Sequence, residues 1–127
     1  MDFEKLYQAS YGLLTDTNLA VILLPNGAKP IQGNSIYQLS VSFHHHCIKL
    51  SQMNKINKKE EFNKLARMYM RLSLEIRALY ESKLLDTRHY QRLSRRLNKI
   101  LEAYNQLARL KDWETINEQT PPSVSEL

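Results

Sequence analysis

Residues 58–107 read KKEEFNKLARMYMRLSLEIRALYESKLLDTRHYQRLSRRLNKILEAYNQL, and this stretch decides the fold. Apolar residues recur at every third or fourth position, which is typical of amphipathic helices. The pattern breaks at Lys83–Thr87, so we expect one helix over about 58–82 and another from about 87 to 111 or 113, with Asp86 or Thr87 as its N-cap. So short a connection predicts an antiparallel hairpin. The predicted inward-facing residues are Phe62, Leu65, Ala66, Tyr69, Leu72, Ile76, Leu79 and Tyr80, then Tyr90, Leu93, Leu97, Ile100, Leu101, Tyr104, Leu107 and Ala108.

The N-terminal half predicts two further helices, with weaker patterns. Over residues 2–24 the residues at helical spacing are Phe3, Leu6, Tyr7, Leu14, Val21 and Leu24, although Gly12 and the polar residues 15–18 allow a break. A loop over 25–34 and a second helix with Ser35 as its N-cap follow. The aromatic and β-branched residues of 36–43 leave a strand as the alternative there. We predict an all-α, up-and-down four-helix bundle over residues 1–113 and a flexible acidic tail over 114–127.

Five basic side chains of the last predicted helix lie on one side of it. At about 100° per residue they fall within a sector of roughly 100°. They are Arg88, Arg92, Arg95, Arg96 and Lys99, here named the basic stripe. Lys64, Arg67 and Arg71, the second basic set, lie opposite the apolar side of the preceding helix and are expected to extend the same surface. The chain carries +5 overall and +9 over residues 1–111, because only acidic charges follow Lys111, which favours contact with a phosphate polymer.

Other site chemistries find no support in the sequence. His44, His45 and His46 are adjacent, so on a helix their side chains diverge and do not converge on one ion. We expect His45 in solvent and the other two beside the core. Cys47, the single cysteine, is predicted to be a buried structural thiol. No glycine-rich phosphate loop, nucleophilic triad or paired carboxylates occur, so we predict no enzyme activity, no metal site and no cofactor.

The tyrosines fall into two groups. Periodicity predicts that Tyr69, Tyr80, Tyr90 and Tyr104 are half-buried core residues with their hydroxyls at the edge, whereas Tyr11 and Tyr37 are freer. Protein interfaces and stacked nucleic-acid bases both favour tyrosine.

The expected location is the cytoplasm. The first residues lack the plan of a signal peptide, and the longest apolar run, residues 19–24, is too short to span a bilayer. A single cysteine fits a reducing compartment. We therefore expect a soluble protein without membrane contact.

The stretch from Lys58 to Leu107 resembles the last two helices of a bacterial four-helix-bundle family. This family includes proteins encoded in intervening sequences of 23S ribosomal RNA genes and the accessory variability proteins of diversity-generating retroelements. The shared features are Lys59-Glu60-Glu61-Phe62, Leu74-Glu75-Ile76, the element Tyr90, Leu93 and Ser94, and the register of Leu97 and Ile100. Residues 38–50, QLSVSFHHHCIKL, depart from the intervening-sequence branch, which usually has an Asn-Ile-Ala-Glu-Gly stretch there. The element Tyr90, Leu93 and Ser94 and the basic charge make the chain look more similar to the retroelement branch. The resemblance implies a ring-forming oligomer, commonly a pentamer, that binds nucleic acid and a reverse transcriptase.

These observations favour a non-catalytic nucleic-acid-binding accessory protein that binds RNA or DNA through the basic stripe and the second basic set. Its contacts are expected at phosphates, which makes binding sensitive to salt and weakly sequence-specific. The alternative is a protein-interaction scaffold whose basic surface docks an acidic partner. A small enzyme ranks last, because no catalytic constellation is present.

Overall fold

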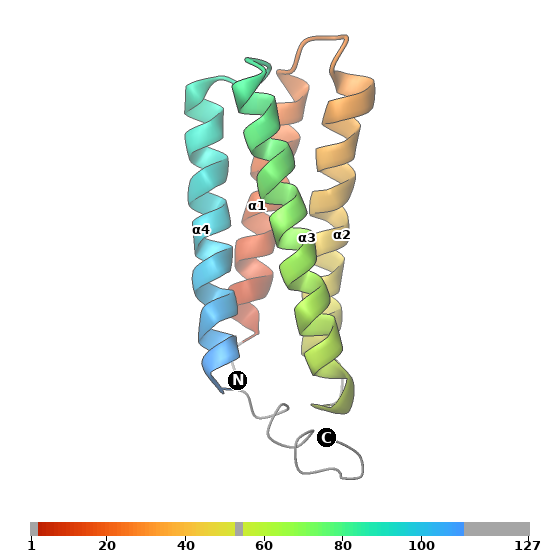
Figure 1. Cartoon of the computed structure of the whole chain (residues 1–127), viewed down its shortest axis with the longest axis vertical. Coiled ribbons are helices and arrows are strands. Elements are labelled where there is room, and N and C mark those ends of the chain that lie inside the picture. The colour runs from red at the N-terminus through yellow and green to blue at the C-terminus, as the bar shows by residue number, and fades with distance from the viewer. Residues whose placement is uncertain (1–2, 53–54, 111–127) are drawn as a thin grey trace.

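The chain forms a four-helix bundle, seen in the computed structural model, which describes residues 3–52 and 55–110 (Figure 1). Its helices are α1 (Glu4–Ile22), α2 (Asn34–Gln52), α3 (Lys55–Glu81) and α4 (Thr87–Leu110), with a short π-helical turn, η1 (Lys29–Gly33), before α2. Successive helices run in opposite directions. α1 packs on α2 and α4, and α3 also packs on α2 and α4, so α1 and α3 are diagonal partners. The predicted up-and-down bundle is therefore confirmed; the predicted tail over 114–127 lies outside the described residues.

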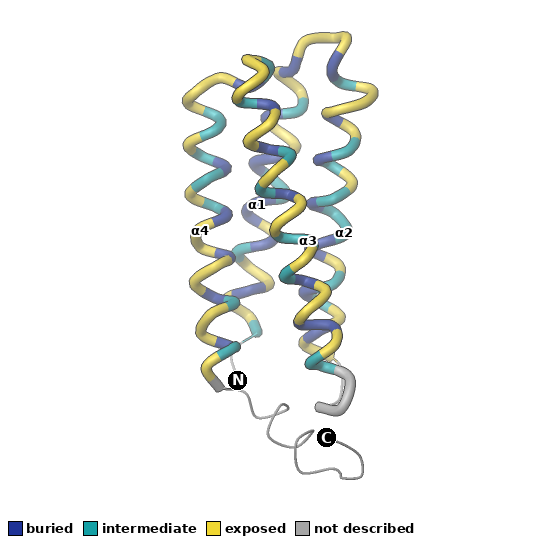
Figure 2. The backbone as a smooth tube through the Cα atoms, in the orientation of Figure 1, coloured by how far each residue is buried: buried dark blue, intermediate teal, exposed yellow. Residues whose placement is uncertain are grey.

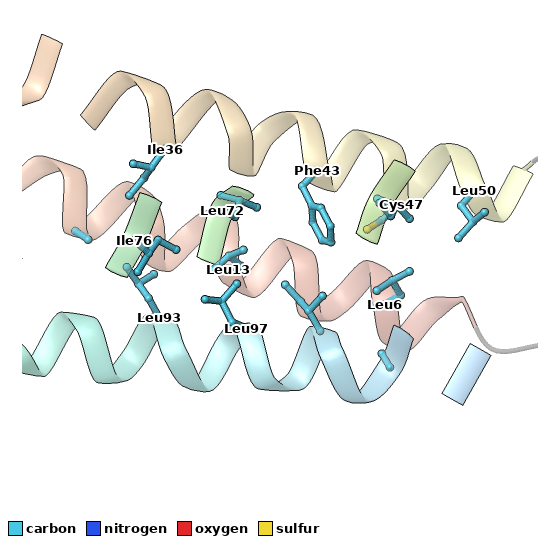
Figure 3. Packing of buried hydrophobic residues seen from close by; sticks show 14 of the residues in the cluster. Leu6, Leu13, Ile36, Phe43, Cys47, Leu50, Leu72, Ile76, Leu93 and Leu97 are labelled. Atoms are coloured by element: carbon cyan, nitrogen blue, oxygen red, sulfur yellow. The ribbon is translucent and has the colours of Figure 1, made fainter. Parts of the chain in front are cut away.

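Buried positions recur along each helix (Figure 2), and buried hydrophobic side chains from all four helices meet in the interior of the bundle (Figure 3). The fully enclosed side chains are Phe43, Leu6, Leu13, Ile36, Leu50, Leu65, Leu72, Ile76, Leu93, Ile100 and Leu107. Burial of this apolar area is the main stabilising contribution to the fold. The inward-facing residues predicted for α3 and α4 are buried or half-buried, with the exception of Leu101, which is exposed.

α1 is one uninterrupted helix, so the break considered at residues 15–18 does not occur. Its buried positions include Leu6, Ser10, Leu13, Thr17 and Ala20, which alternate at spacings of four and three. Two of these five residues, Ser10 and Thr17, are polar. The apolar pattern alone therefore predicted some inward-facing positions of α1 wrongly. Leu13 rather than Leu14 is fully buried, and Tyr7 is exposed.

The start of α2 also differs from the prediction. Residues 29–33 form the π-helical turn, closed by a hydrogen bond from the Gly33 amide to the Ala28 carbonyl at 2.9 Å, and α2 continues directly from it. Ser35 is not an N-cap: its hydroxyl donates to Glu75 Oε1 of α3 at 2.7 Å. The strand alternative over 36–43 is wrong, because these residues lie within α2.

The turn between α3 and α4 is fixed by backbone hydrogen bonds. The Leu84 amide donates to the Leu79 carbonyl and the Lys83 amide to the Tyr80 carbonyl, both at 3.0 Å, a pairing typical of helix C-termini. Lys83 adopts the left-handed conformation, with φ of 64°. Asp86 then caps α4, accepting a hydrogen bond from the His89 amide at 2.8 Å. The tight turn and the Asp86 cap are both confirmed.

The interface between α3 and α4 confirms the prediction that its four tyrosines are half-buried. The hydroxyl of Tyr69 donates to the Leu97 carbonyl at 3.1 Å, and that of Tyr104 donates to the Phe62 carbonyl at 3.2 Å. Burial raises the pKa of both phenols above the ordinary value. Tyr80 and Tyr90 stack with their ring centroids 4.1 Å apart. These contacts define which sides of α3 and α4 face each other, and this decides where their basic residues point.

Candidate nucleic-acid interface

The basic stripe lies on the side of α4 that turns toward α1. Its anchor is Arg96, whose Nε donates to Oδ2 of the buried Asp16 on α1 at 2.6 Å. On its own helix the stripe meets an acidic residue at its end, where Glu102 follows Lys99 by three residues, and the bundle supplies a second carboxylate, that of Asp16, from α1. Arg96 is therefore partly neutralised and ties α1 to α4.

Gly12 makes room for this guanidinium. A Cβ atom at position 12 would lie 2.6 Å from Nη1 and 3.0 Å from Cζ of Arg96. These distances are shorter than van der Waals contact, so a larger residue would displace the Arg96 side chain. The glycine that weakens the helical pattern of α1 thus serves the contact with α4.

Next to this ion pair, α1 and α4 enclose a groove of about 360 Å³. It is lined by Lys5, Gln8, Ala9, Arg96, Lys99, Glu102, Ala103 and Gln106 and is here named the α1–α4 groove. Three cationic side chains and two amides converge there against a single carboxylate. All the amide and cationic groups can donate hydrogen bonds to phosphate oxygens. Lys5 was missed by sequence reasoning, because it is isolated in α1 and only the antiparallel pairing with α4 brings it to the stripe.

The rest of the stripe runs along α4 away from the groove. Arg88 and Arg95 are exposed and Arg92 is half-buried. Within residues 3–52 and 55–110, Arg92, Arg95 and Lys99 form no ion pair. The pKa of Asp86, the residue that caps α4, is lowered mainly by hydrogen bonds from the backbone and side chain of His89. The nearby charge of Arg88 adds to this effect. The stripe thus presents several uncompensated positive charges to solvent.

The second basic set does not extend this surface. Arg71 pairs with Glu75 at 3.0 Å, and Glu75 also accepts the hydrogen bond from Ser35 of α2. At about 100° per residue, Lys64 and Arg67 point in nearly the same direction as Arg71. Phe62 marks the side of α3 that faces α4, because its ring stacks on that of Tyr104. The three basic residues point well away from that side. All three are exposed on the α2 side of α3, whereas the stripe lies on the α1 side of α4. The two basic groups occupy different sides of the bundle.

A cluster of rings occupies the opposite flank of α1, against α2. His44 is 7% exposed, and its ring centroid lies 5.0 Å from that of Tyr7 and 5.6 Å from that of Tyr11. The Ser10 hydroxyl donates to the Tyr7 carbonyl at 2.9 Å, so its oxygen accepts from His44 Nδ1 at 2.8 Å. Burial, followed by the charge of His45, lowers the pKa of His44 below its ordinary value. The imidazole is thus held neutral near pH 7.

The other two histidines lie as expected from the sequence. His45 is exposed and His46 is half-buried at the boundary with α3. His46 Nδ1 lies 2.5 Å from Oε2 of the buried Glu61, and Lys49 Nζ lies 3.8 Å from Oε1 of the same carboxylate. This pairing explains why a glutamate is tolerated in the core of α3, and it leaves Glu61 engaged in a contact between helices.

Cys47 is buried, as predicted, one turn after His44. Burial is the main cause that raises the pKa of its thiol to about 12. The group therefore stays protonated at neutral pH, which fits a structural role rather than that of a nucleophile.

Within the described residues no group of three or more His, Cys, Asp or Glu side chains is placed to hold a metal ion. In the same part of the chain, none of the helices has both the length and the apolar character needed to cross a membrane. Comparison of the chain with family models, with curated proteins and with solved structures gives no match.

Proposed function

We propose that the protein is a non-catalytic nucleic-acid-binding accessory protein, and that the basic stripe together with Lys5 is its binding surface. The observation that carries this proposal is the convergence of Lys5, Arg96 and Lys99 in the α1–α4 groove, continued along α4 by Arg92 and Arg95. Like charges gathered in this way repel one another, and a phosphate backbone relieves that repulsion. The contacts are with phosphate, so they carry little sequence information.

The proposal extends to assembly and partner through the family resemblance. In this reading the protein forms a ring, commonly of five copies, and assists a reverse transcriptase of a diversity-generating retroelement in the cytoplasm. Two apolar side chains on α3 support the need for a protein contact: Met70 is 63% exposed and Leu74 is 65% exposed. They lie one helical turn apart, so they form a single apolar strip that another protein surface can cover.

A second candidate function is a scaffold that docks an acidic protein, and exposed leucines beside the stripe favour it. Leu19 on α1 and Leu23, the C-cap residue of that helix, are exposed. They stand seven and eleven residues after Gly12, so they point in nearly the same direction, toward α4. An acidic segment with apolar residues would find both charges and apolar contacts there. Nucleic acid remains the first proposal, because the groove itself is polar and cationic.

The test is the fluorescence anisotropy of labelled structured RNA and of labelled single-stranded DNA, titrated with the full chain at about 50 and about 200 mM salt. Four to five phosphate contacts predict a fall in affinity on the order of a hundredfold between these salt concentrations. Combining Arg92→Glu with Arg95→Glu should abolish binding.

The matched control combines Lys64→Glu with Arg67→Glu on α3. It changes the net charge by the same amount on the other side of the bundle, so it should weaken binding much less. Equal losses in the two double variants would show that only overall charge matters. Absence of binding at low salt would remove nucleic acid and favour the acidic-protein scaffold.

A further inference from the structure

Tyr7 and Tyr11 form a largely exposed aromatic surface on α1. Tyr7 is 41% exposed and Tyr11 is 54% exposed, although both rings pack near His44 on the flank of α2. The imidazole of His45 is also exposed, and its ring centroid lies 6.5 Å from that of His44. Tyr7, Tyr11 and His45 are here named the tyrosine patch. Such rings are the usual platform for the faces of nucleic-acid bases.

The rings of the patch are held in place before any ligand arrives. His44 is fixed through Ser10, which also bonds the backbone of Tyr7, and each tyrosine ring is tilted against the His44 ring, at 43° and 51°. One side of each ring is thereby supported and much of the remainder stays in contact with water. A side chain that is already ordered loses less conformational entropy on binding.

The patch lies across α1 from the α1–α4 groove. Lys5 and Gln8 line the groove, whereas Tyr11 packs toward α2. Lys5, Gln8 and Tyr11 follow one another at intervals of three residues, and each step turns about 60° around the helix. This path leads over the exposed face of α1, from cations on the α4 side to rings on the α2 side. Its width is that of one helix, about 10–12 Å with side chains.

We propose that the ligand is a single-stranded nucleic acid, with its phosphates in the α1–α4 groove and its bases stacked on Tyr7 and Tyr11. In a duplex the base faces are enclosed within the stack, so the rings could not reach them. A single strand offers both its backbone and its base faces at once. This inference rests on the proposed function, and it names the class of nucleic acid that the surface selects.

The experiment compares two labelled oligonucleotides of equal length, about 15 nucleotides, one of thymidine and one of abasic sites. Both carry the same phosphates, so stacking is the difference between them. The full chain should bind the thymidine strand about tenfold more tightly. Replacing both rings, by Tyr7→Leu with Tyr11→Leu, should lower that affinity to the value for the abasic strand and leave the abasic strand unaffected.

The matched control is Tyr7→Phe with Tyr11→Phe, which keeps both rings and should keep the preference. Far-ultraviolet circular dichroism and thermal melting of each variant show whether it is folded. Lys5→Glu should weaken binding of both strands alike. Equal binding of both strands by the native protein would overturn the stacking proposal while leaving phosphate binding intact, whereas binding of neither strand at low salt would overturn the proposed function itself.

Discussion

Burial changes the chemistry of single residues in this bundle, and Cys47 is an example. Its thiol is buried beside Ser10, and burial is the main cause that raises its pKa to about 12. The thiol is therefore protonated at neutral pH, and Cys47 is only 1% exposed, so reagents in solution have little access to its sulfur atom.

We expect Cys47 to resist alkylation and disulfide exchange in the native protein and to react at an ordinary rate once the protein is unfolded. Thiol titration at about pH 8, with and without denaturant, measures the contrast. Rapid modification of the folded protein would contradict the buried position.

A second residue-scale prediction concerns Lys83, whose φ of 64° suits glycine better than a residue with a Cβ atom. The substitution Lys83→Gly should raise the free energy of unfolding by about 0.5–1 kcal/mol, because relief of steric strain outweighs the added freedom of the unfolded chain. Urea denaturation followed by circular dichroism measures the change. The control Lys83→Ala retains the Cβ atom and should give no gain; a gain of equal size would point to the lysine charge instead.

A third residue-scale prediction concerns His44 and pH. Its pKa is 6.5 in a model compound and is lowered in the folded state by burial and then by His45. As pH falls through 6.5, the unfolded chain takes up a proton before the folded chain does, so the free energy of unfolding decreases until the pH is below the folded-state pKa.

The measurement compares the native protein with His44→Gln at about pH 7.5 and about pH 5.5. The stability advantage of the native protein should shrink at the lower pH. An advantage that stays constant or grows would contradict the direction of the shift. The comparison of two proteins removes the part of the pH dependence that does not involve His44.

At the scale of elements, the ion pair between α1 and α4 affects both the stability of the bundle and the charge of the proposed interface. Asp16 neutralises Arg96 in the middle of the proposed interface. The substitution Asp16→Asn should lower the free energy of unfolding by about 1 kcal/mol, since one charged hydrogen bond is weakened. It also adds one positive charge to the interface, so polyanion affinity should rise severalfold in low-salt anisotropy titrations.

Glu102→Gln is the matched control, because it also removes one negative charge beside Arg96 and Lys99, in the α1–α4 groove, and leaves the Arg96–Asp16 pair in place. It should tighten binding at little cost in stability. Weaker binding by Asp16→Asn alone would mean that Asp16 positions Arg96 for the ligand instead of competing with it.

Elements differ in how far they could be predicted from the sequence. α3 and α4 have regular apolar stripes, and their residues, turn and cap were predicted almost completely. α1 was harder, because Ser10 and Thr17 occupy core positions and no apolar pattern marks them. The Thr17 hydroxyl has no hydrogen-bond partner within the described residues, so its burial could not be inferred from any polar contact either.

At the scale of the whole molecule, the candidate site depends on which helices are neighbours. The basic stripe could be read from helical spacing within one segment. Lys5, Asp16 and Gly12 could not be assigned to it, because they are separated from Arg96 by 80 or more residues and meet it only in the folded bundle. For the same reason the second basic set was expected on the wrong side: the rotation of α3 relative to α4 follows from packing.

The final prediction concerns the acidic segment after Lys111, which lies outside the described residues. Residues 112–127 carry four acidic and no basic side chains, so we expect this segment to compete with polyanions for the basic stripe. Deleting residues 112–127 should tighten polyanion binding, most strongly at low salt, as measured by anisotropy. An unchanged affinity would exclude this competition. A deletion variant that also carries Arg92→Glu and Arg95→Glu should show no such gain.

Gly12 also has a consequence for motion. A glycine in the middle of a helix costs about 1 kcal/mol relative to alanine, so α1 is intrinsically weakest where it receives the Arg96 side chain. Its backbone amides there should open to hydrogen exchange when α1 separates from α4, before the rest of the bundle unfolds. A strand bound across both helices would hold them together. Binding of the ligand should therefore slow hydrogen exchange of the backbone amides around Gly12, even though the ligand contacts only side chains on the surface of the helix.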